Sequence, residues 1–399
     1  MIDKVKLEKN IPKVFWIKFF SGFMLLMPVI VPFFQSTNIG MKGVYLLQSV
    51  FAVSVFILEV PSGYVSDILG RKKTIMIAMC FKAIGWSLFP FSHGIEMLVV
   101  AEIILAFAVS LVSGTDTALL YDSLEALGSK KAQIKILGKS LSYFSFGEAI
   151  AALLTTLLLY LGLTVRDLAW ISGAVAWIPF FIVMSMIEPP RKTMGSQHKE
   201  NFKYILEGIF KQSRLLNLIL LNTVLSFVGT LCAVWLFQKY WEDLHIPITY
   251  FGLLWALTNF TVAFVSRKAH KIEKIWGSKN TLLFLGLLPI AGYFGISFVD
   301  HTLGFLVCLI FQTCRAIGQV VFKDALNKRV SADFRATANS ITAMGVRIIF
   351  TFLGPLIGWS IDTRGMSSTT FYMGLFYIAV FIFALLPLLK ERKNFIPVK

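Results

Sequence analysis

The feature that most constrains this chain is a series of apolar runs, each about as long as a lipid bilayer is thick. A membrane-spanning helix needs about 20 predominantly apolar residues, and roughly twelve runs in the sequence meet that length. Inside a bilayer each backbone N–H and C=O must be satisfied within its own segment, so such runs predict helices. The expected helix cores are residues 14–34, 44–65, 74–91, 97–121, 139–161, 168–187, 215–237, 250–266, 281–298, 303–322, 337–361 and 371–389.

Composition points to the same class. Hydrophobic residues make up 56% of the 399 residues and charged residues 15%, which leaves too little polar surface for a water-soluble protein of this length. The net charge of +16 would suggest a nucleic-acid partner in a soluble protein. Here the basic residues fall between the apolar runs, so we attribute the charge to membrane topology and expect no nucleic-acid partner. We therefore expect an all-α integral membrane protein with about twelve transmembrane helices.

The basic residues are distributed unevenly over the connections. One side of the predicted helices carries most of the Lys and Arg residues, including both ends of the chain and residues 71–73. The opposite side has little beyond Lys42, Arg166, Lys239 and Arg364. By the positive-inside rule both termini are expected to be cytoplasmic, which requires an even number of helices. The first apolar run lacks a small-residue cleavage site, so we interpret it as a retained helix and not a signal peptide.

The longest polar connection divides the predicted helices into two sets of six. It contains Pro189 and Pro190, followed by an amphipathic stretch at residues 202–210 that is suited to the membrane surface. We interpret residues 1–187 as an N-terminal six-helix bundle, 188–214 as a cytoplasmic linker and 215–399 as a C-terminal six-helix bundle.

Weak internal repetition indicates that the two bundles are pseudo-symmetric. Residues 120–124, at the end of the fourth predicted helix, are echoed by residues 322–326 at the end of the tenth. Gly70 and Lys72 have counterparts in Gly277 and Lys279, although Lys274 occupies the position that corresponds to Asp67. Repeats of this kind are typical of membrane carriers in which two bundles rock about a site near the bilayer midplane.

A short polar motif separates the second and third predicted helices. Its sequence, at residues 63–73, is GYVSDILGRKK. Two glycines permit a tight turn and a close approach between helices, and an Asp at the membrane edge can face a helix N-terminus or an Arg. Such a contact contributes from a few tenths to about 2 kcal/mol, which is small enough to be made and broken repeatedly. We predict a conformational hinge formed by Gly63, Asp67, Gly70, Arg71 and Lys72.

The motif resembles the loop signature of the major facilitator superfamily of secondary transporters. That signature reads Gly-x-x-x-Asp-(Arg/Lys)-x-Gly-Arg-(Arg/Lys), and the five hinge residues match it, whereas Ile68 stands where the family usually has a basic residue. The resemblance extends over essentially the whole chain in helix number, central connection and hinge position. It implies a carrier that moves a small solute across the bilayer by alternating access.

Two further segments resemble one bacterial branch of that superfamily. Residues 58–63 (LEVPSG) and 113–124 (SGTDTALLYDSL) are similar to those of proteins commonly grouped with drug and macrolide efflux. This resemblance implies export and a location in the bacterial cytoplasmic (inner) membrane. Two efflux signatures differ, because Glu102 stands where an Arg is common in the fourth helix and residues 147–149 lack a proline.

Four ionisable residues fall near the predicted midplane of the membrane. An ionisable group at that depth costs at least a few kcal/mol, so each needs a partner, a water-filled cavity or a function. Asp116 and Glu148 belong to the N-terminal half, and Arg315 and Arg347 to the C-terminal half. The resemblance implies that their helices line one central cavity. Two hypotheses stay open: the four form salt bridges between helices, or an acid accepts a proton while an arginine tunes it or binds an anionic group.

Other polar residues in the predicted helices are secondary candidates. Glu59 and Lys82 lie close enough in depth to pair with each other, and Glu102 shares a helix with Asp116. Gln312 and Gln319 lie on the helical face of Arg315. Pro28 and Pro32 are expected to kink the first helix.

The sequence favours a secondary active transporter, coupled to protons, that exports an amphipathic compound and works as a monomer. The midplane arginines motivate an alternative, import or export of an anionic metabolite such as a carboxylate siderophore. We expect no cofactor and no metal, because residues 133–140 fail the phosphate-loop pattern at Gln133 and the histidines lie in or beside connections. A membrane-embedded enzyme would need a nucleophile and base, and a non-transporting scaffold would have no reason to keep the hinge.

Overall fold

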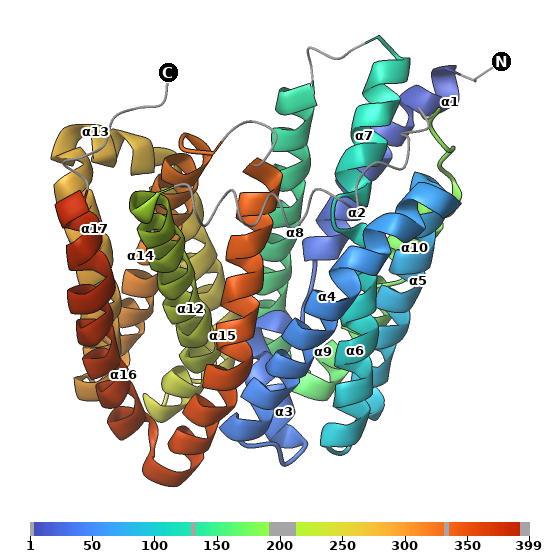
Figure 1. Cartoon of the computed structure of the whole chain (residues 1–399). Helices are drawn as coiled ribbons and strands as arrows, with labels where there is room; N and C mark the ends of the chain where they lie inside the picture. The colour runs from blue at the N-terminus through green and yellow to red at the C-terminus, as the bar shows by residue number, and fades with distance from the viewer. Residues whose placement is uncertain (1–3, 129–132, 191–212, 331–334, 392–399) are drawn as a thin grey trace. The chain divides into compact units, whose positions relative to one another are not determined.

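The computed structural model describes residues 4–128, 133–190, 213–330 and 335–391, except for the side chains of residues 60, 63, 64, 67, 134, 135 and 336. These ranges are built from helices and connections and contain no strand (Figure 1). The all-α class predicted from the apolar runs is therefore confirmed. The amphipathic stretch predicted at residues 202–210 lies outside the described ranges.

Eleven stretches of the described chain are long and apolar enough to cross a membrane. One of them, Ile248–Phe298, has 51 residues. At 1.5 Å per residue it would be roughly 76 Å long if straight, more than twice the hydrocarbon thickness of about 30 Å. It is interrupted at Gly277, whose φ of 72° and ψ of 158° are not helical. Two helices therefore meet there, and the prediction of about twelve transmembrane helices is confirmed.

The chain divides into two compact units. Unit 1 comprises Met1–Thr193 and Pro247–Ala256, and unit 2 comprises Met194–Ile246 and Leu257–Lys399. The domain boundaries predicted at residues 188 and 214 stay a prediction, because residues 191–212 are not described.

Unit 1 contains the first six predicted transmembrane helices in ten α-helical segments. Their bounds are α1 Lys4–Glu8, α2 Asn10–Gly22, α3 Ile30–Ser36, α4 Met41–Leu69, α5 Arg71–Leu88, α6 Ile95–Val112, α7 Thr115–Ala126, α8 Gln133–Tyr160, α9 Val165–Val175 and α10 Ile178–Met184, with 3₁₀ turns η1 at Met27–Val29 and η2 at Phe89–Phe91. Unit 1 also includes η4 Ile248–Tyr250 and the first turns of α13.

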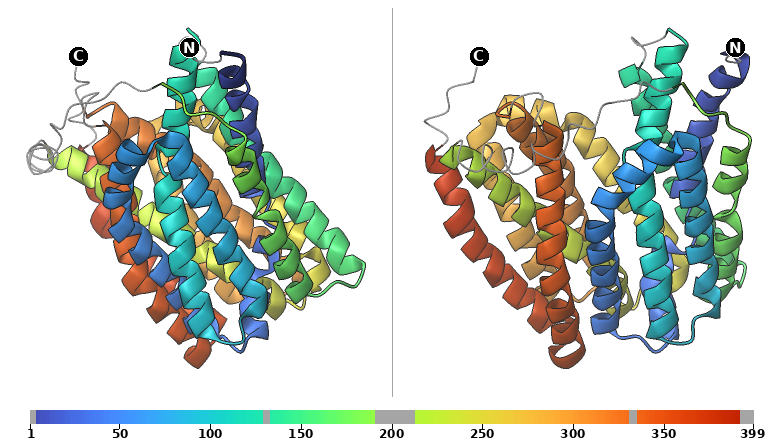
Figure 2. Two further views of the ribbon diagram at one scale, coloured as in Figure 1. Left: turned by 90° about the vertical axis from the view of Figure 1, so that its right-hand side faces the viewer. Right: turned by 45° about the vertical axis from the view of Figure 1, so that its right-hand side comes forward.

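Several pairs of helices in unit 1 pack against each other. Helix α5 lies against α6 and α9, α4 lies against α6, and α2 lies against α8 (Figure 2). A buried apolar cluster joins α2, α5, α6, α7 and the end of α10; it consists of Val14, Ile17, Ile75, Ala78, Met79, Leu111, Leu119, Val183 and Met186. This cluster lies within a few helical turns of the junction between α4 and α5. Buried apolar packing therefore supports the helices on which the junction depends.

Helices α2 and α8 approach each other through two glycines. A Cβ at Gly22 would lie 2.2 Å from the backbone oxygen of Phe144, and one at Gly147 would lie 2.1 Å from the backbone oxygen of Phe19. Neither distance is possible for a real Cβ atom, so only glycine permits this spacing of the two backbones.

Unit 2 is built from the remaining helices. Their bounds are α12 Arg214–Asp243, α13 Phe251–Phe298 (which begins in unit 1), α14 Phe305–Asn327, α15 Arg335–Arg364, α16 Met366–Val380 and α17 Leu386–Glu391, with η5 at Thr302–Gly304 and a π-helical segment η7 at Phe381–Leu385. Helix α12 packs against α14 and α15. Leu216, Ile219, Leu285, Ile317 and Leu388 belong to the core that these helices enclose.

The internal repeat has a structural counterpart. Gly70, between α4 and α5, has φ 103° and ψ 154°, close to the conformation of Gly277 within α13. Thr74 donates a hydrogen bond from its hydroxyl to the carbonyl of Gly70 at 2.7 Å, and Thr281 donates one to the carbonyl of Gly277 at 3.0 Å. The two units thus share one helix-to-helix junction, in which a glycine is followed four residues later by a threonine.

Candidate functional site

The predicted hinge is a single-residue junction. Helix α4 continues through Gly63 and Asp67 to Leu69, and α5 begins at Arg71. The predicted extent of the connection, residues 63–73, is therefore wrong, because the helices occupy all of it except Gly70. Gly70 alone connects the two helices, in a region of φ and ψ that is essentially restricted to glycine. The side chain of Asp67 lies outside the described residues, so its predicted role in the hinge stays a prediction.

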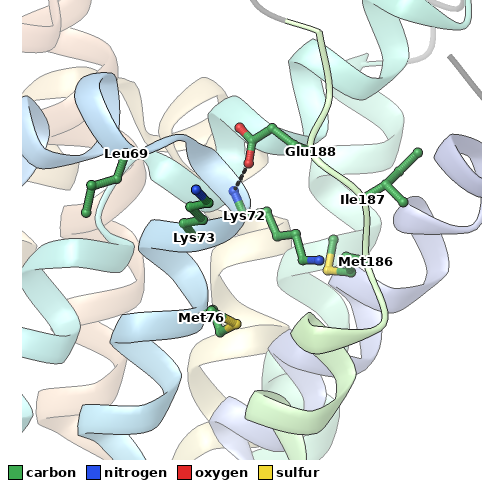
Figure 3. A pocket seen from close by; sticks show the side chains of 7 residues that line it. All are labelled: Leu69, Lys72, Lys73, Met76, Met186, Ile187 and Glu188. Carbon is green, nitrogen blue, oxygen red and sulfur yellow. Dashed lines mark hydrogen bonds between the residues drawn. The ribbon is translucent and has the colours of Figure 1, made fainter. Parts of the chain in front are cut away.

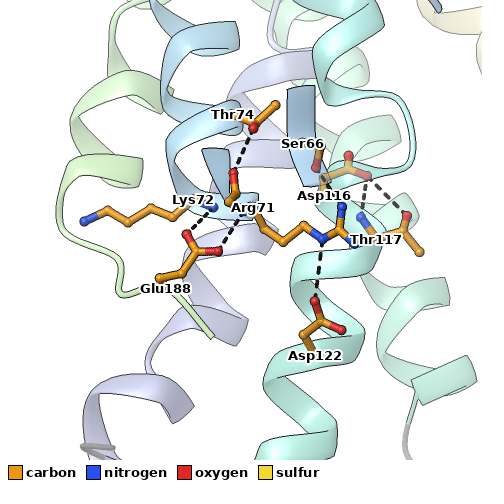
Figure 4. Close-up of polar contacts among 9 residues, drawn as sticks. Ser66, Arg71, Lys72, Thr74, Asp116, Thr117, Asp122 and Glu188 are labelled. Atoms are coloured by element: carbon orange, nitrogen blue, oxygen red, sulfur yellow. Dashed lines mark hydrogen bonds and ion pairs between the residues drawn. The ribbon is translucent and has the colours of Figure 1, made fainter. Parts of the chain in front are cut away.

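Arg71 holds the junction together from the first turn of α5. Its guanidinium donates a hydrogen bond to the hydroxyl of Ser66 on α4 at 2.7 Å, and its Nε lies 3.6 Å from Oδ2 of Asp122 on α7 (Figure 4). The Arg71 and Asp122 side chains are 20% and 29% exposed, so water screens part of their attraction. One arginine thus links three helices through contacts weak enough to exchange.

Glu188 caps the N-terminus of α5. Its two carboxylate oxygens accept hydrogen bonds from the backbone N–H groups of Arg71 at 2.7 Å and Lys72 at 2.9 Å (Figure 4). The first N–H groups of a helix have no partner within it, and the helix dipole favours a negative charge at this end. Because Gly70 precedes the helix, no side chain at the cap position can supply that acceptor. A residue from beyond α10 supplies it instead.

A cavity of about 510 Å³ opens beside this cap. The apolar side chains of its lining are those of Leu69, Met76, Met186 and Ile187, and the charged residues are Lys72, Lys73 and Glu188 (Figure 3). Two lysines and one glutamate line the cavity, so its formal net charge is positive.

Asp116 pairs with a lysine of the first span. It lies in the first turn of α7, just after Gly114 with φ +77°, and is 7% exposed. Lys18 on α2 donates to Oδ2 of Asp116 and forms a salt bridge with it, while the backbone N–H of Thr117 donates to Oδ1 at 2.6 Å. The described contacts of Asp116 therefore lie within unit 1.

The other three midplane candidates are divided between the units. Glu148 lies on α8 in unit 1, where the indole N–H of Trp255 donates to its Oε1 at 3.4 Å. Arg315 lies on α14 and Arg347 on α15, both half-buried in unit 2. The convergence of all four on one cavity stays a prediction.

The secondary candidates have local surroundings. The Lys82 ammonium donates to the carbonyl of Ser21 at 3.0 Å, so the structure does not show the pairing proposed with Glu59, which is half-buried on α4. Glu102 is 4% exposed and accepts a hydrogen bond at 3.2 Å from the Gln48 side chain on α4.

The two glutamines of α14 differ in burial. Gln312 is 2% exposed, and its Oε1 has no hydrogen-bond partner in the described part of the chain, whereas Gln319 is half-buried.

Sequence reasoning missed Lys18 and Glu188. Lys18 is a lone cation inside the first apolar run, and the cost of a charge at that depth could have marked it as needing an acid. Glu188 stands between the sixth run and Pro189, where it was interpreted as the start of the linker. No local pattern could identify its partners, because they are backbone groups more than a hundred residues earlier.

Comparison with known proteins shows which family this chain matches. The family model described as Major Facilitator Superfamily matches residues 17–355. YxaM of Bacillus subtilis strain 168, an uncharacterized MFS-type transporter, is 24% identical over 378 residues, which is 91% of this chain and 90% of YxaM. The class H tetracycline resistance protein of Pasteurella multocida is 23% identical over 347 residues, 84% of each chain.

Solved structures show the same fold. The nucleoside transporter NupG matches with a TM-score of 0.77 and 14% identity, covering 98% of this chain and 100% of NupG. The D-xylose–proton symporter matches with a TM-score of 0.70 and 15% identity, covering 97% and 99% of the two chains. The helical fold, the glycine junction between its second and third spans and a family match over most of its length show that this chain belongs to the Major Facilitator Superfamily, whose members are membrane transporters and not enzymes.

Proposed function

We propose that this transporter exports a small amphipathic solute by alternating access, driven by a proton gradient. It acts as a monomer in the bacterial cytoplasmic (inner) membrane, with both termini in the cytoplasm. The likeness to a tetracycline resistance protein supports export, and the concentration of Lys and Arg in the connections on one side supports the orientation.

The observation that carries the alternating-access mechanism is the contact network around Arg71. This network joins α4, α5, α7 and the segment after α10 through polar contacts that are only partly buried. The groups that make these contacts are the Arg71 guanidinium and backbone N–H, the Ser66 hydroxyl, and the carboxylates of Asp122 and Glu188. Contacts of this strength hold one arrangement of helices without preventing another, as a carrier that changes shape in each cycle requires.

An aromatic cluster supports an amphipathic solute. Trp16, Phe19, Phe20 and Phe23 follow one another along the first span, and Tyr143 of α8 contacts Trp16 edge-on at 6.0 Å between ring centroids. Trp16 remains 47% exposed. Aromatic faces of this kind bind planar apolar groups and cations, which are parts of many amphipathic compounds.

Proton coupling is assigned to Glu148 or Asp116, the two acids of unit 1 at the depth of the proposed transport path. In this scheme one carboxylate accepts a proton from outside the cell as the solute is released there, and gives that proton up to the cytoplasm before the next solute binds. The alternative solute class is an anionic metabolite, which Arg315 and Arg347 on the spans of unit 2 would bind.

The test uses purified protein reconstituted in proteoliposomes with an imposed pH gradient and a panel of fluorescent amphipathic dyes. Wild type should accumulate at least one dye, whereas Glu148→Gln or Asp116→Asn should abolish gradient-driven accumulation while the dye still binds. Glu96→Gln, at an exposed acid in the first turn of α6, is the matched control and should transport normally. Full transport by both variants would remove the proton-site assignment.

The same assay distinguishes between an amphipathic solute and an anionic one. Raised apparent KM values for anions in Arg315→Ala and Arg347→Ala, with no dye transport by wild type, would favour the anionic alternative. A thermal-shift screen against antibiotics, siderophores and metabolites identifies the solute, since a bound ligand raises the stability of the folded state.

A further inference from the structure

The first span of unit 1 is broken in the middle. Helix α2 ends at Gly22, Phe23 has φ −77° and ψ 77°, and the chain resumes as η1 at Met27 before α3 begins at Ile30. Pro28 explains the break, because its ring clashes with the carbonyl four residues earlier and it has no N–H to donate. Backbone groups near the break therefore lose their helical partners at a depth where water cannot replace them.

Side chains from three other helices supply the missing partners. Thr155 of α8, fully buried, donates its hydroxyl to the carbonyl of Leu25 at 2.7 Å. The backbone N–H of Leu26 donates to the hydroxyl of Ser172 on α9 at 3.1 Å. The ammonium of Lys82 on α5 donates to the carbonyl of Ser21 at 3.0 Å. All three contacts lie within unit 1, so the break is a built feature of this unit.

Lys82 differs from the two hydroxyls because its amine can carry a proton and with it a positive charge. It lies roughly 16 Å along α5 from Arg71, at 1.5 Å per residue, and is half-buried. Its hydrogen-bond partner among the described residues is a neutral carbonyl, whereas the neighbouring Lys18 has Asp116 as its counterion. A hydroxyl would be enough to satisfy one carbonyl, so the use of a lysine at this position calls for an electrostatic reason.

The C-terminal end of α2 provides that reason. Carbonyl groups at the end of a helix carry partial negative charge and favour cations. In membrane carriers, unwound carbonyls and the C-terminal ends of half-helices are ligands for monovalent cations. Ser21 lies in the last turn of α2, so its carbonyl offers this environment to the Lys82 side-chain nitrogen that donates a hydrogen bond to it.

We propose that the break in the first span is a monovalent-cation site that the chain fills with its own Lys82 ammonium. The tethered cation replaces a free ion, so the folded protein needs no dissolved sodium to stabilise the broken helix. If the tether is removed, the site should accept a small cation that fits the vacated space, such as ethylammonium or Na⁺. This inference concerns an ion site and does not depend on the solute, direction or coupling proposed above.

The test is the thermal unfolding of purified full-length protein in a buffer whose only salt is choline chloride. Wild type should keep the same Tm when ethylammonium or Na⁺ is added. Lys82→Ala should unfold several degrees lower and recover in a saturable way with ethylammonium or Na⁺, but not with additional choline, which is too large to enter. Lys82→Arg, which keeps a cation at this position, should behave like wild type.

Two matched controls separate a cation site from a merely weakened break. Thr155→Val and Ser172→Ala remove neutral hydrogen bonds from the same break, so their Tm should fall without any recovery in ethylammonium or Na⁺. The proposal is overturned if neither small cation raises the Tm of Lys82→Ala, or if choline or the two control variants show the same rise.

A second variant covers the case in which Lys82→Ala does not fold. Lys82→Cys treated with an aminoethylating reagent regains an ammonium at nearly the original position, whereas a methylating thiol reagent leaves the site neutral. Recovery of the Tm after aminoethylation but not after methylation supports the proposal. Equal Tm values after the two treatments contradict it. Wild type treated in parallel accounts for reaction at the native cysteines.

Discussion

Glu188 and Arg71 are 117 positions apart in the chain, yet Oε1 of Glu188 accepts a hydrogen bond of 2.7 Å from the backbone N–H of Arg71. This contact fastens the end of the sixth span to the start of the third. It also explains how a helix preceded by glycine begins without a cap of its own, because the carboxylate supplies both the acceptor and the negative charge that the helix end favours.

Replacing Glu188 should destabilise unit 1 and impair transport. Glu188→Ala leaves the N–H groups of Arg71 and Lys72 without their acceptor, and loss of a cap costs about 1 kcal/mol. Glu188→Gln retains one acceptor oxygen but loses the charge, so its Tm should lie between those of Glu188→Ala and wild type. Glu391→Gln is the control, since its pair with the 75% exposed side chain of Arg214 contributes little. Equal Tm values for Glu188→Ala and Glu391→Gln would exclude a capping role.

The glycine junctions should not tolerate a side chain. Gly70→Ala and Gly277→Ala place a Cβ in a backbone region that costs roughly 1–3 kcal/mol for other residues, so each should lower the Tm measured by thermal unfolding. Gly138→Ala in α8 is the matched control, because its Cβ would meet no atom within 4 Å and alanine favours helix. A Gly70→Ala variant as stable as Gly138→Ala would show that the junction adopts another conformation.

Arg71 and Asp122 should show coupled effects on transport. Arg71→Ala and Asp122→Ala each break the same partly exposed ion pair, so the double variant should lose less than the sum of the single losses. The expected coupling in stability is about 0.5–1 kcal/mol, and a double-mutant cycle on both Tm and initial transport rate measures it. Strictly additive losses would mean that the pair does not act as a unit.

For the pair formed by Lys18 and Asp116, each single substitution should reduce stability more than the double substitution does. Removing one partner strands a largely buried charge, which costs roughly 3–5 kcal/mol, whereas removing both leaves no charge to compensate. Lys18→Met or Asp116→Leu alone should therefore lower the Tm more than the double variant does. Lys239→Met, which breaks an exposed pair with Asp243 in α12, should change the Tm little. A double variant worse than either single one would contradict this account.

The helical class and the number of membrane crossings could be predicted because both follow from local composition. An apolar run of sufficient length has one solution in a bilayer, so the helices required no knowledge of tertiary contacts. The repeat could also be predicted in part: Gly70 and Gly277 were matched by sequence, and their backbone conformations agree. The extent of the junction was not predicted, because polar residues 63–69 read as a loop although they continue α4.

The partners of the charged residues could not be predicted, because they depend on which helices adjoin. Lys82 was a candidate partner for Glu59, whereas its described hydrogen bond is to the carbonyl of Ser21, next to a break in another helix. Glu188 serves backbone N–H groups, which carry no side-chain signature. The kink expected at Pro28 does occur as a break, since a proline acts on its own helix.

The two glycines that bring α2 and α8 together also restrict how the carrier can work. With Gly22 against Phe144 and Gly147 against Phe19, the first and fifth spans touch backbone to backbone, and any sliding would drive other side chains into the gap. We therefore expect α2 and α8 to move together. The bending that admits and releases cargo has to come from elsewhere in the molecule.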